Sequence, residues 1–190
     1  MRLFTAVELP SDVREQLAAA ARAINYKISL VAEANLHITL KFLGEVPESK
    51  VAELCEEFQR VSAVGPVPLR AEKVECFPQR GPIRIIAVRI GGDTLRLVQL
   101  YKNIEQACER YGIPPERRPY YPHITAARAR NPLPADRRHN LEMLMKPSLA
   151  CTPFVANEFV LMQSHLKGDG PEYIRLASFR LTKPELETLP

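Results

Sequence analysis

The sequence predicts an α+β fold, and two features lead to that class. The expected elements follow the order β-α-β-α-β-β-α-β-α-β-β, which departs from the strict alternation of a parallel doubly wound sheet. The strand-like runs 66–77 and 83–90 are joined by the turn sequence PQRGP, and the tail 154–181 reads as two strands around the turn GDGP. Adjacent strands of this kind indicate antiparallel hairpins.

The other elements follow from residue type and spacing. Strands rich in β-branched and aromatic residues are expected at 3–9, 36–43 and 120–127. Four helices are expected from composition or apolar spacing, at 13–24, 47–61, 94–111 and 134–145. Ser11 and Asp12 supply N-cap chemistry for the first helix, and Gly112 stands at the C′ position of the third. At 190 residues the chain fits one domain or two small lobes that share an interface.

Composition narrows the class of protein only a little. The formal net charge of +4 and the pI of about 8.9 are compatible with an anionic ligand but do not require one. The four cysteines contain no Cys-x-x-Cys pair, which excludes a zinc ribbon and a thioredoxin-type motif. The N-terminal apolar run is too short for a signal peptide, and no stretch reaches the length of a membrane span. We therefore expect a reduced cytoplasmic protein without a membrane partner.

The tripeptide His-Ile-Thr occurs twice, at 37–39 and 123–125. The chain has only four histidines and seven threonines, so two chance occurrences are improbable. Side chains two positions apart on a strand project to the same face, about 6.6–6.8 Å apart. Each copy therefore presents an imidazole and a hydroxyl together. Apolar residues are expected on the opposite faces, namely Leu36, Ile38, Leu40 and Phe42 in the first strand and Ile124 and Ala126 in the second.

If the two strands approach one another, His37, Thr39, His123 and Thr125 share a cleft. Histidine titrates near pKa 6.5, so one imidazole can act as a base while the other acts as an acid. The hydroxyls can donate hydrogen bonds to the oxygens of a phosphate. No third histidine or nearby carboxylate completes a zinc site, so we predict phosphoryl chemistry with no metal and no cofactor. The alternative is that each His-x-Thr is an ordinary structural pair.

Other catalytic motifs are missing from the sequence. It contains no Gly-x-Ser-x-Gly elbow, no P-loop and no Gly-x-Gly-x-x-Gly, so acyl transfer by a serine triad and nucleotide hydrolysis lack support. His139, in the stretch ADRRHN, and His165, near a hairpin, are expected at the surface.

At the level of whole motifs the sequence resembles a known family. RLFTAVELP, NLHITLKFLGEV, ECFPQRGPIRIIAV and RRPYYPHITAARAR are similar to the LigT-like RNA 2′,3′-cyclic phosphodiesterase branch of the 2H phosphoesterase superfamily. The closing pattern from FVLMQSHL to YIRLASFRL matches as well. The resemblance covers nearly the whole chain. It implies a single two-lobed domain over residues 1–190, with antiparallel sheets facing across a V-shaped cleft.

The resemblance also implies an activity and a role for each motif residue. The implied enzyme opens a 2′,3′-cyclic phosphate on an RNA end to a 2′-phosphate. His37 would protonate the leaving 3′ oxygen, His123 would activate water, and Thr39 and Thr125 would hold the phosphate. The family places an arginine five residues after the second histidine, which is Arg128 here. Regular alternation puts that residue on the opposite face from His123, so it reaches the site only if the strand ends, twists or bulges after Thr125.

Two alternative activities stay open. One is a non-catalytic module that binds RNA ends in the same cleft, although intact histidines in both motifs favour the enzyme. The other is weak, reversible RNA ligation at the same site, which forms 2′-5′ linkages. The expected partners are RNA ends or small nucleotides with a 2′,3′-cyclic phosphate, and the protein is expected to be a monomer.

Residues around the motifs supply candidates for binding the rest of the substrate. Many relatives carry a tryptophan shortly before the first motif, whereas this chain has none. Base stacking would then fall to other aromatic residues, for which the candidates are Tyr120, Tyr121 and Phe42. A basic group surrounds the second motif, which fits RNA or merely a solvated face, and consists of Arg117, Arg118, Arg128, Arg130, Arg137 and Arg138.

Overall fold

The computed structural model describes residues 1–145, 153–168 and 170–183. Within these residues nine strands form one sheet with the order β7-β4-β5-β6-β3-β1-β8-β9, and β2 pairs with β6 beside this path. Every pair of neighbouring strands is antiparallel. The strands are β1 (Arg2–Glu8), β2 (Ser29–Leu30), β3 (His37–Glu45), β4 (Val67–Phe77), β5 (Ile83–Gly92), β6 (His123–Leu133), β7 (Phe154–Ala156), β8 (Glu158–Lys167) and β9 (Gly170–Arg180).

The sheet divides into two halves where β3 meets β6. In the part of the chain that the structure describes, one residue pair, Ile38 with Ile124, joins these two strands. We call β2, β4, β5, β6 and β7 the first half-sheet, and β1, β3, β8 and β9 the second half-sheet. Two antiparallel half-sheets joined along a narrow seam confirm the predicted α+β, two-lobed fold.

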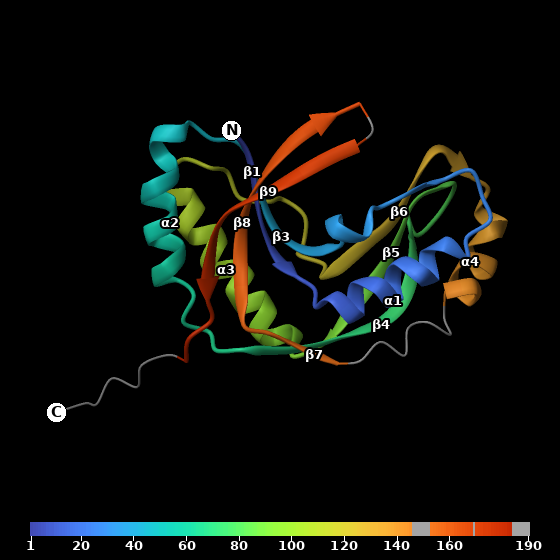
Figure 1. Cartoon of the computed structure of the whole chain (residues 1–190), viewed down its shortest axis with the longest axis horizontal. Helices are drawn as coiled ribbons and strands as arrows, with labels where there is room; N and C mark the ends of the chain where they lie inside the picture. The colour runs from blue at the N-terminus through green and yellow to red at the C-terminus, as the bar shows by residue number, and fades with distance from the viewer. Residues whose placement is uncertain (146–152, 169, 184–190) are drawn as a thin grey trace.

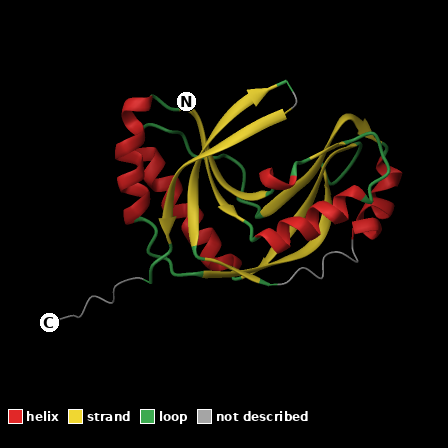
Figure 2. Ribbon diagram, in the orientation of Figure 1, coloured by secondary structure: helices red, strands yellow, loops and turns green. Residues whose placement is uncertain are grey.

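The helices cover the outer faces of the two half-sheets. Helix α1 contacts β6 and α4 contacts β4 in the first half-sheet. Helix α2 contacts β9 in the second half-sheet, and α3 contacts β3 of the second and also β4 of the first. Figure 1 shows the first group at the right and the second at the left, and Figure 2 shows the strands running between the two groups. The bounds are α1 (Ser11–Arg22), α2 (Val51–Arg60), α3 (Thr94–Arg110) and α4 (Arg138–Met145).

Strand β1, which pairs with the strand of the first His-x-Thr motif, is buried on both faces. Leu3 and Val7 belong to the main core, on the face that the helices cover. Phe4 and Ala6 belong to a smaller cluster on the opposite face, against which Tyr173 of β9 packs. The face of the second half-sheet that the helices do not cover therefore has an apolar cluster next to the first His-x-Thr strand.

The predicted order of elements is confirmed, with differences at the ends. The short strand β2 was not predicted, because two residues carry no readable alternation. The first strand predicted in the tail divides into β7 and β8. The predicted helix 47–61 divides into a 3₁₀ turn, η2 (Glu48–Lys50), and α2, and the predicted helix 134–145 into η3 (Ala135–Arg137) and α4. The strand expected at 120–127 begins at His123 and continues to Leu133.

The predicted end of α3 is confirmed and the predicted start of α1 is wrong. Gly112 follows the C-cap of α3 with a φ of +75°, a left-handed conformation that side chains with a Cβ rarely adopt. The residue before α1 is Pro10, and no side chain caps this helix. Instead, the amide of Arg14 donates to the carbonyl oxygen of Pro10 at 3.0 Å. Asp169, which belongs to the predicted GDGP turn, lies outside the described residues.

Candidate active site

The seam between the half-sheets brings the two His-x-Thr motifs together. Ile38 and Ile124 form the joining pair and are fully buried. The residue on each side of them points to the opposite face, because side chains alternate along a strand. The two imidazoles and two hydroxyls, together with Arg128, line one cavity of about 640 Å³. The structure thus gathers all five residues predicted for the site, namely His37, Thr39, His123, Thr125 and Arg128.

Antiparallel pairing sets the arrangement of these side chains. With Ile38 opposite Ile124, the register places His37 across from Thr125 and Thr39 across from His123. The two histidines therefore occupy diagonal positions, about 7–8 Å apart at the backbone. Each histidine has a hydroxyl from its own strand and a hydroxyl from the other strand as neighbours.

A β-bulge follows each motif at the same position. In β3, Thr5 pairs with Lys41 and Ala6 with Thr39, which leaves Leu40 as the extra residue. In β6 the register shifts in the same way, so that Ala126 is the extra residue between Thr125 and Ala127. A bulge puts two consecutive side chains on one face and reverses the alternation beyond it. The third residue after each histidine is therefore the point at which each motif strand changes phase.

The bulges decide where the fifth residue after each histidine points. Ala126 and Ala127 are both buried, and Arg128 returns to the cavity face. The strand therefore bulges after Thr125, which is one of the ways in which Arg128 was expected to reach the site. The prediction that Phe42 belongs to an apolar core face is wrong, because the bulge at Leu40 turns Phe42 into the cavity, with 65% of its surface exposed.

Both imidazoles are held in the same way. Nδ1 of His37 lies 2.7 Å from the carbonyl oxygen of Asn35, and Nδ1 of His123 lies 2.7 Å from that of Tyr121. A carbonyl oxygen can only accept, so Nδ1 carries the hydrogen in both rings. The second nitrogen, Nε2, is then left to exchange protons in the cavity. In His37 it lies 3.0 Å from Oγ1 of Thr39.

The surroundings of the two histidines differ. His37 is enclosed by Phe4, with ring centroids 5.0 Å apart, and by Tyr173, 5.4 Å away and edge-on at 85°. Burial lowers the pKa of His37 below its usual value of 6.5, and the charges of His123 and Arg128 lower it further, against the hydrogen bond to Asn35. His37 is therefore an imidazole that releases its proton readily.

The structure adds residues that the sequence did not indicate. The tip of the β8–β9 hairpin lines the cavity with Pro171, Glu172 and Tyr173. The side-chain amide of Asn35 donates to the carbonyl oxygen of Pro171 at 2.8 Å. This contact ties the hairpin to the segment before β3, across 136 residues of sequence. The Gly-Asp-Gly-Pro signal located the hairpin but not the cavity beneath it.

Of the three aromatic candidates for base stacking, Phe42 is the one that lines the cavity. Tyr120 stacks on Tyr101, with ring centroids 4.3 Å apart, and its hydroxyl donates to the carbonyl oxygen of Thr39 at 3.1 Å. Tyr121 donates its hydroxyl to the carboxylate of Glu75. Both tyrosines therefore support the motif strands instead of facing the cavity.

The charges that line the cavity are mostly positive. Arg128 and Arg130 lie on β6, and Lys167 lies on the hairpin, where it pairs with Glu172 at 2.8 Å. Other members of the basic group have different contacts. Arg138 donates to one backbone carbonyl oxygen near the end of β4 and to two in the β4–β5 turn, and Arg118 pairs with Glu116.

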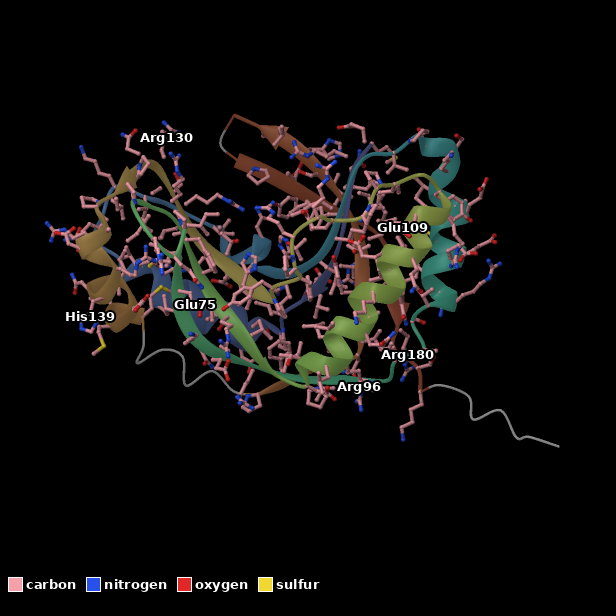
Figure 3. The ribbon with its side chains drawn as sticks, turned by 180° about the vertical axis from the view of Figure 1, so that it is seen from behind. Glu75, Arg96, Glu109, Arg130, His139 and Arg180 are labelled. Carbon is pink, nitrogen blue, oxygen red and sulfur yellow. The ribbon has the colours of Figure 1, made fainter. Side chains whose placement is uncertain are left out.

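His139 and His165 do not line the cavity. His139 is exposed on α4, far from the seam (Figure 3), and His165 is half-buried on β8. No three His, Cys, Asp or Glu side chains gather as metal ligands within residues 1–145, 153–168 and 170–183. None of the helices among these residues is long and apolar enough to cross a membrane.

The chain belongs to the LigT-like phosphoesterase family. The family model matches residues 7–87 and 93–173. An RNA 2′,3′-cyclic phosphodiesterase of Methanocaldococcus jannaschii is 32% identical over 176 residues, which cover 91% of this chain and 96% of that protein.

Solved structures agree with the family assignment. The crystal structure of TT0787 of Thermus thermophilus has a TM-score of 0.80 and 28% identity, with coverage of 97% of this chain and 100% of that one. The structure of E. coli LigT complexed with 3′-AMP has a TM-score of 0.74 and 25% identity, with coverage of 96% and 98%. These chains share the two-lobed fold described above.

Proposed function

We propose that this protein is an RNA 2′,3′-cyclic phosphodiesterase, which opens a 2′,3′-cyclic phosphate at an RNA end to a 2′-phosphate. The observation that carries the proposal is the antiparallel seam, which sets one imidazole on each side of a shared cavity. The names of the relatives support the same reaction. We further propose that the chain works as a single two-lobed domain, since each half-sheet contributes one motif.

The diagonal arrangement fits an in-line displacement at phosphorus. In such a reaction the attacking oxygen and the leaving oxygen lie on opposite sides of the phosphorus atom. A backbone separation of about 7–8 Å between His37 and His123 leaves room for a phosphate between their Nε2 atoms. One imidazole can then reach the attacking water while the other reaches the leaving oxygen.

The proton transfers balance over the two histidines. Nε2 of neutral His123 accepts a proton from water as its oxygen bonds to phosphorus. The bond between phosphorus and the 3′ oxygen breaks, and protonated His37 donates its Nε2 proton to that oxygen. The products are a 2′-phosphate and a free 3′ hydroxyl, and the two imidazoles return to their starting states by exchange with solvent.

Thr39, Thr125 and Arg128 are proposed to hold the phosphate. Their donors line the same cavity as the imidazoles, and fixed donors stabilise the charge that develops on the phosphoryl oxygens. The hydroxyl of Thr39 already contacts Nε2 of His37. When a phosphate binds, its oxygens would form hydrogen bonds to the hydroxyl of Thr39 and to Nε2 of His37 in place of this contact.

The lowered pKa of His37 makes its imidazolium a stronger acid toward the leaving oxygen, but it also leaves less imidazolium present near neutral pH. The bound phosphate is an anion, and a nearby negative charge favours the imidazolium form. Substrate binding would therefore help to charge the acid that the reaction uses.

Two further activities are proposed for the same cavity. With a 5′ hydroxyl in place of water as the nucleophile, the same groups could open a 2′,3′-cyclic phosphate with departure of the 3′ oxygen, which forms a 2′-5′ linkage. A module that binds RNA ends without turnover would use the same donors. Neither needs residues beyond those already described.

The test is incubation of the protein and EDTA with an oligoribonucleotide that ends in a 2′,3′-cyclic phosphate, followed by identification of the product. We expect a 2′-phosphate, with losses of about 10²–10⁴-fold in His37→Ala and in His123→Ala. The matched control is His139→Ala, because His139 is exposed on α4. Tight binding of an unchanged substrate would establish the binding module instead. Loss of activity in EDTA would contradict the metal-free reaction.

A further inference from the structure

The cavity extends well beyond the groups that act on the phosphate. Its volume of about 640 Å³ lies in the middle of the range for small-molecule sites, about 300–1,000 Å³. From the seam its lining continues along β6 to Arg130 and across to Lys167 on the β8–β9 hairpin. Two cations therefore line it in addition to Arg128, the one assigned to the reacting phosphate.

Arg130 is placed to meet a second anion. It follows Arg128 by two positions on β6, and both residues line the cavity. Arg130 makes no ion pair with any described residue, and its side chain is exposed. Figure 3 shows Arg130 at the edge of the first half-sheet, on the side toward which the β8–β9 hairpin projects.

Lys167 supplies charge from the other side of the cavity. Its ammonium pairs with Glu172 at 2.8 Å, and both side chains are about half exposed. An ammonium has three donors, so this ion pair leaves donors for a ligand. An exposed ion pair of this kind contributes little stability, so a phosphate can compete with it.

The proposed reaction decides on which side of the phosphate the nucleoside lies. The leaving 3′ oxygen is the one that His37 protonates, and it belongs to the ribose. The ribose must therefore lie toward His37, in the half of the cavity that Lys167 of the β8–β9 hairpin also lines, while Arg130 lines the cavity from β6 on the other side. Tyr173 packs on His37 in this half, and the charge of Arg128 acts on the same ring.

We infer that Arg130 and Lys167 form a second phosphate site, which binds the phosphodiester on the 5′ side of the terminal nucleotide. This inference rests on the proposed function, because that function fixes the position of the ribose. It defines the substrate class as an oligoribonucleotide end, in preference to a nucleoside 2′,3′-cyclic phosphate. The mononucleotide lacks the phosphodiester that these two cations would bind.

The experiment compares kcat/KM for an oligoribonucleotide ending in adenosine 2′,3′-cyclic phosphate with kcat/KM for adenosine 2′,3′-cyclic phosphate itself. We expect the wild-type protein to prefer the oligoribonucleotide. Arg130→Gln should lower the ratio of the two values by about 3- to 10-fold, as for loss of one exposed charged contact. Lys167→Gln should lower it in the same direction. The matched control is Arg180→Gln, at the exposed far end of β9 (Figure 3).

A binding measurement tests the inference even if turnover is absent. The anisotropy of a labelled oligoribonucleotide with a 2′-phosphate end is followed against salt concentration. Loss of one phosphate contact on a single strand should lower the slope of log K against log salt by about 0.7, in Arg130→Gln but not in Arg180→Gln.

The outcomes separate the inference from the function on which it rests. Turnover of both substrates with an equal ratio in wild type and Arg130→Gln would overturn the second site and leave the hydrolase intact. An unchanged salt slope in Arg130→Gln would also overturn it. Failure of the wild type to hydrolyse either substrate would overturn the proposed function. The salt slope of RNA binding would then be the only test of the second phosphate site.

Discussion

Lys41 offers a direct test of how the β3 bulge is held in place. The bulge at Leu40 turns two consecutive side chains inward, so the lysine enters the core with 2% of its side chain exposed. Its Nζ donates to Oε2 of Glu105 on α3 at 2.8 Å and to the carbonyl oxygen of Pro114 at 2.9 Å. We therefore expect this buried ion pair to stabilise the conformation that presents Phe42 to the cavity.

The expected loss of stability depends on which charged group remains buried after each substitution. Lys41→Met keeps the length of the side chain but leaves the carboxylate of Glu105 buried. That carboxylate then retains a bond from the amide of Glu116 at 3.3 Å, while its Oε1 has no partner among the described residues. Removal of one partner of a buried ion pair costs about 3–5 kcal/mol. Replacement of both partners by apolar residues is often close to neutral.

The assay is urea unfolding at pH 7 of wild type, Lys41→Met, Glu105→Leu and the double variant. We expect the double variant to recover most of the loss, which gives a coupling energy of at least about 2 kcal/mol. Lys102→Met on the exposed face of α3 is the control, and it should change the free energy of unfolding by less than about 0.5 kcal/mol. A loss in Lys41→Met no larger than in this control, or additive losses in the double variant, would contradict the role assigned to the ion pair.

Three other predictions concern the site itself. His37 should titrate below pH 6.5 by NMR, and Arg128→Gln should raise the midpoint because it removes a positive charge; an unmoved midpoint would count against the described electrostatics. The pKa of His37 is lower in the folded protein than in the unfolded chain, so the unfolded chain binds more protons just below pH 6.5. The free energy of unfolding should therefore fall as the pH falls through that window, and it should fall less in His37→Gln. Tyr173→Ala should lower kcat by about 10-fold while Tyr173→Phe retains it, since the ring orients His37 by an edge-on contact; equal losses in the two variants would assign the effect to the hydroxyl.

Alternation along a strand predicted which motif residues line the candidate site. His37 and Thr39 share a face, as do His123 and Thr125, and all four line the cavity. That part of the site depends on the local geometry of two short segments, which the sequence contains. The order of the longer strands and helices was predictable for the same reason.

The bulges were not predictable, because they arise from pairing with other strands. Leu40 is extra only relative to β1, and Ala126 only relative to β5. Strict alternation therefore assigned Phe42 to the core. Two signals pointed to a change of phase, namely a lysine within an apolar strand and an arginine at an odd offset from His123.

Contacts between distant segments could not be predicted from the sequence either. Tyr173 and Pro171 approach the first motif only because β9 pairs with β8, and β8 pairs with β1. The bond between Asn35 and Pro171 joins residues 136 positions apart. Such contacts depend on the whole arrangement of strands, which no local pattern specifies.

The most direct test of the proposed mechanism separates the acid from the base. The measurement is the rate of opening of a 2′,3′-cyclic phosphate whose bridging 3′ oxygen is replaced by sulfur, because a thiolate leaves without needing a proton. We predict that His37→Ala approaches the wild-type rate on the sulfur substrate while remaining defective on the oxygen substrate, and that His123→Ala is defective on both. Equal defects of His37→Ala on the two substrates would contradict the role of His37 as the acid on the leaving-group side of the seam.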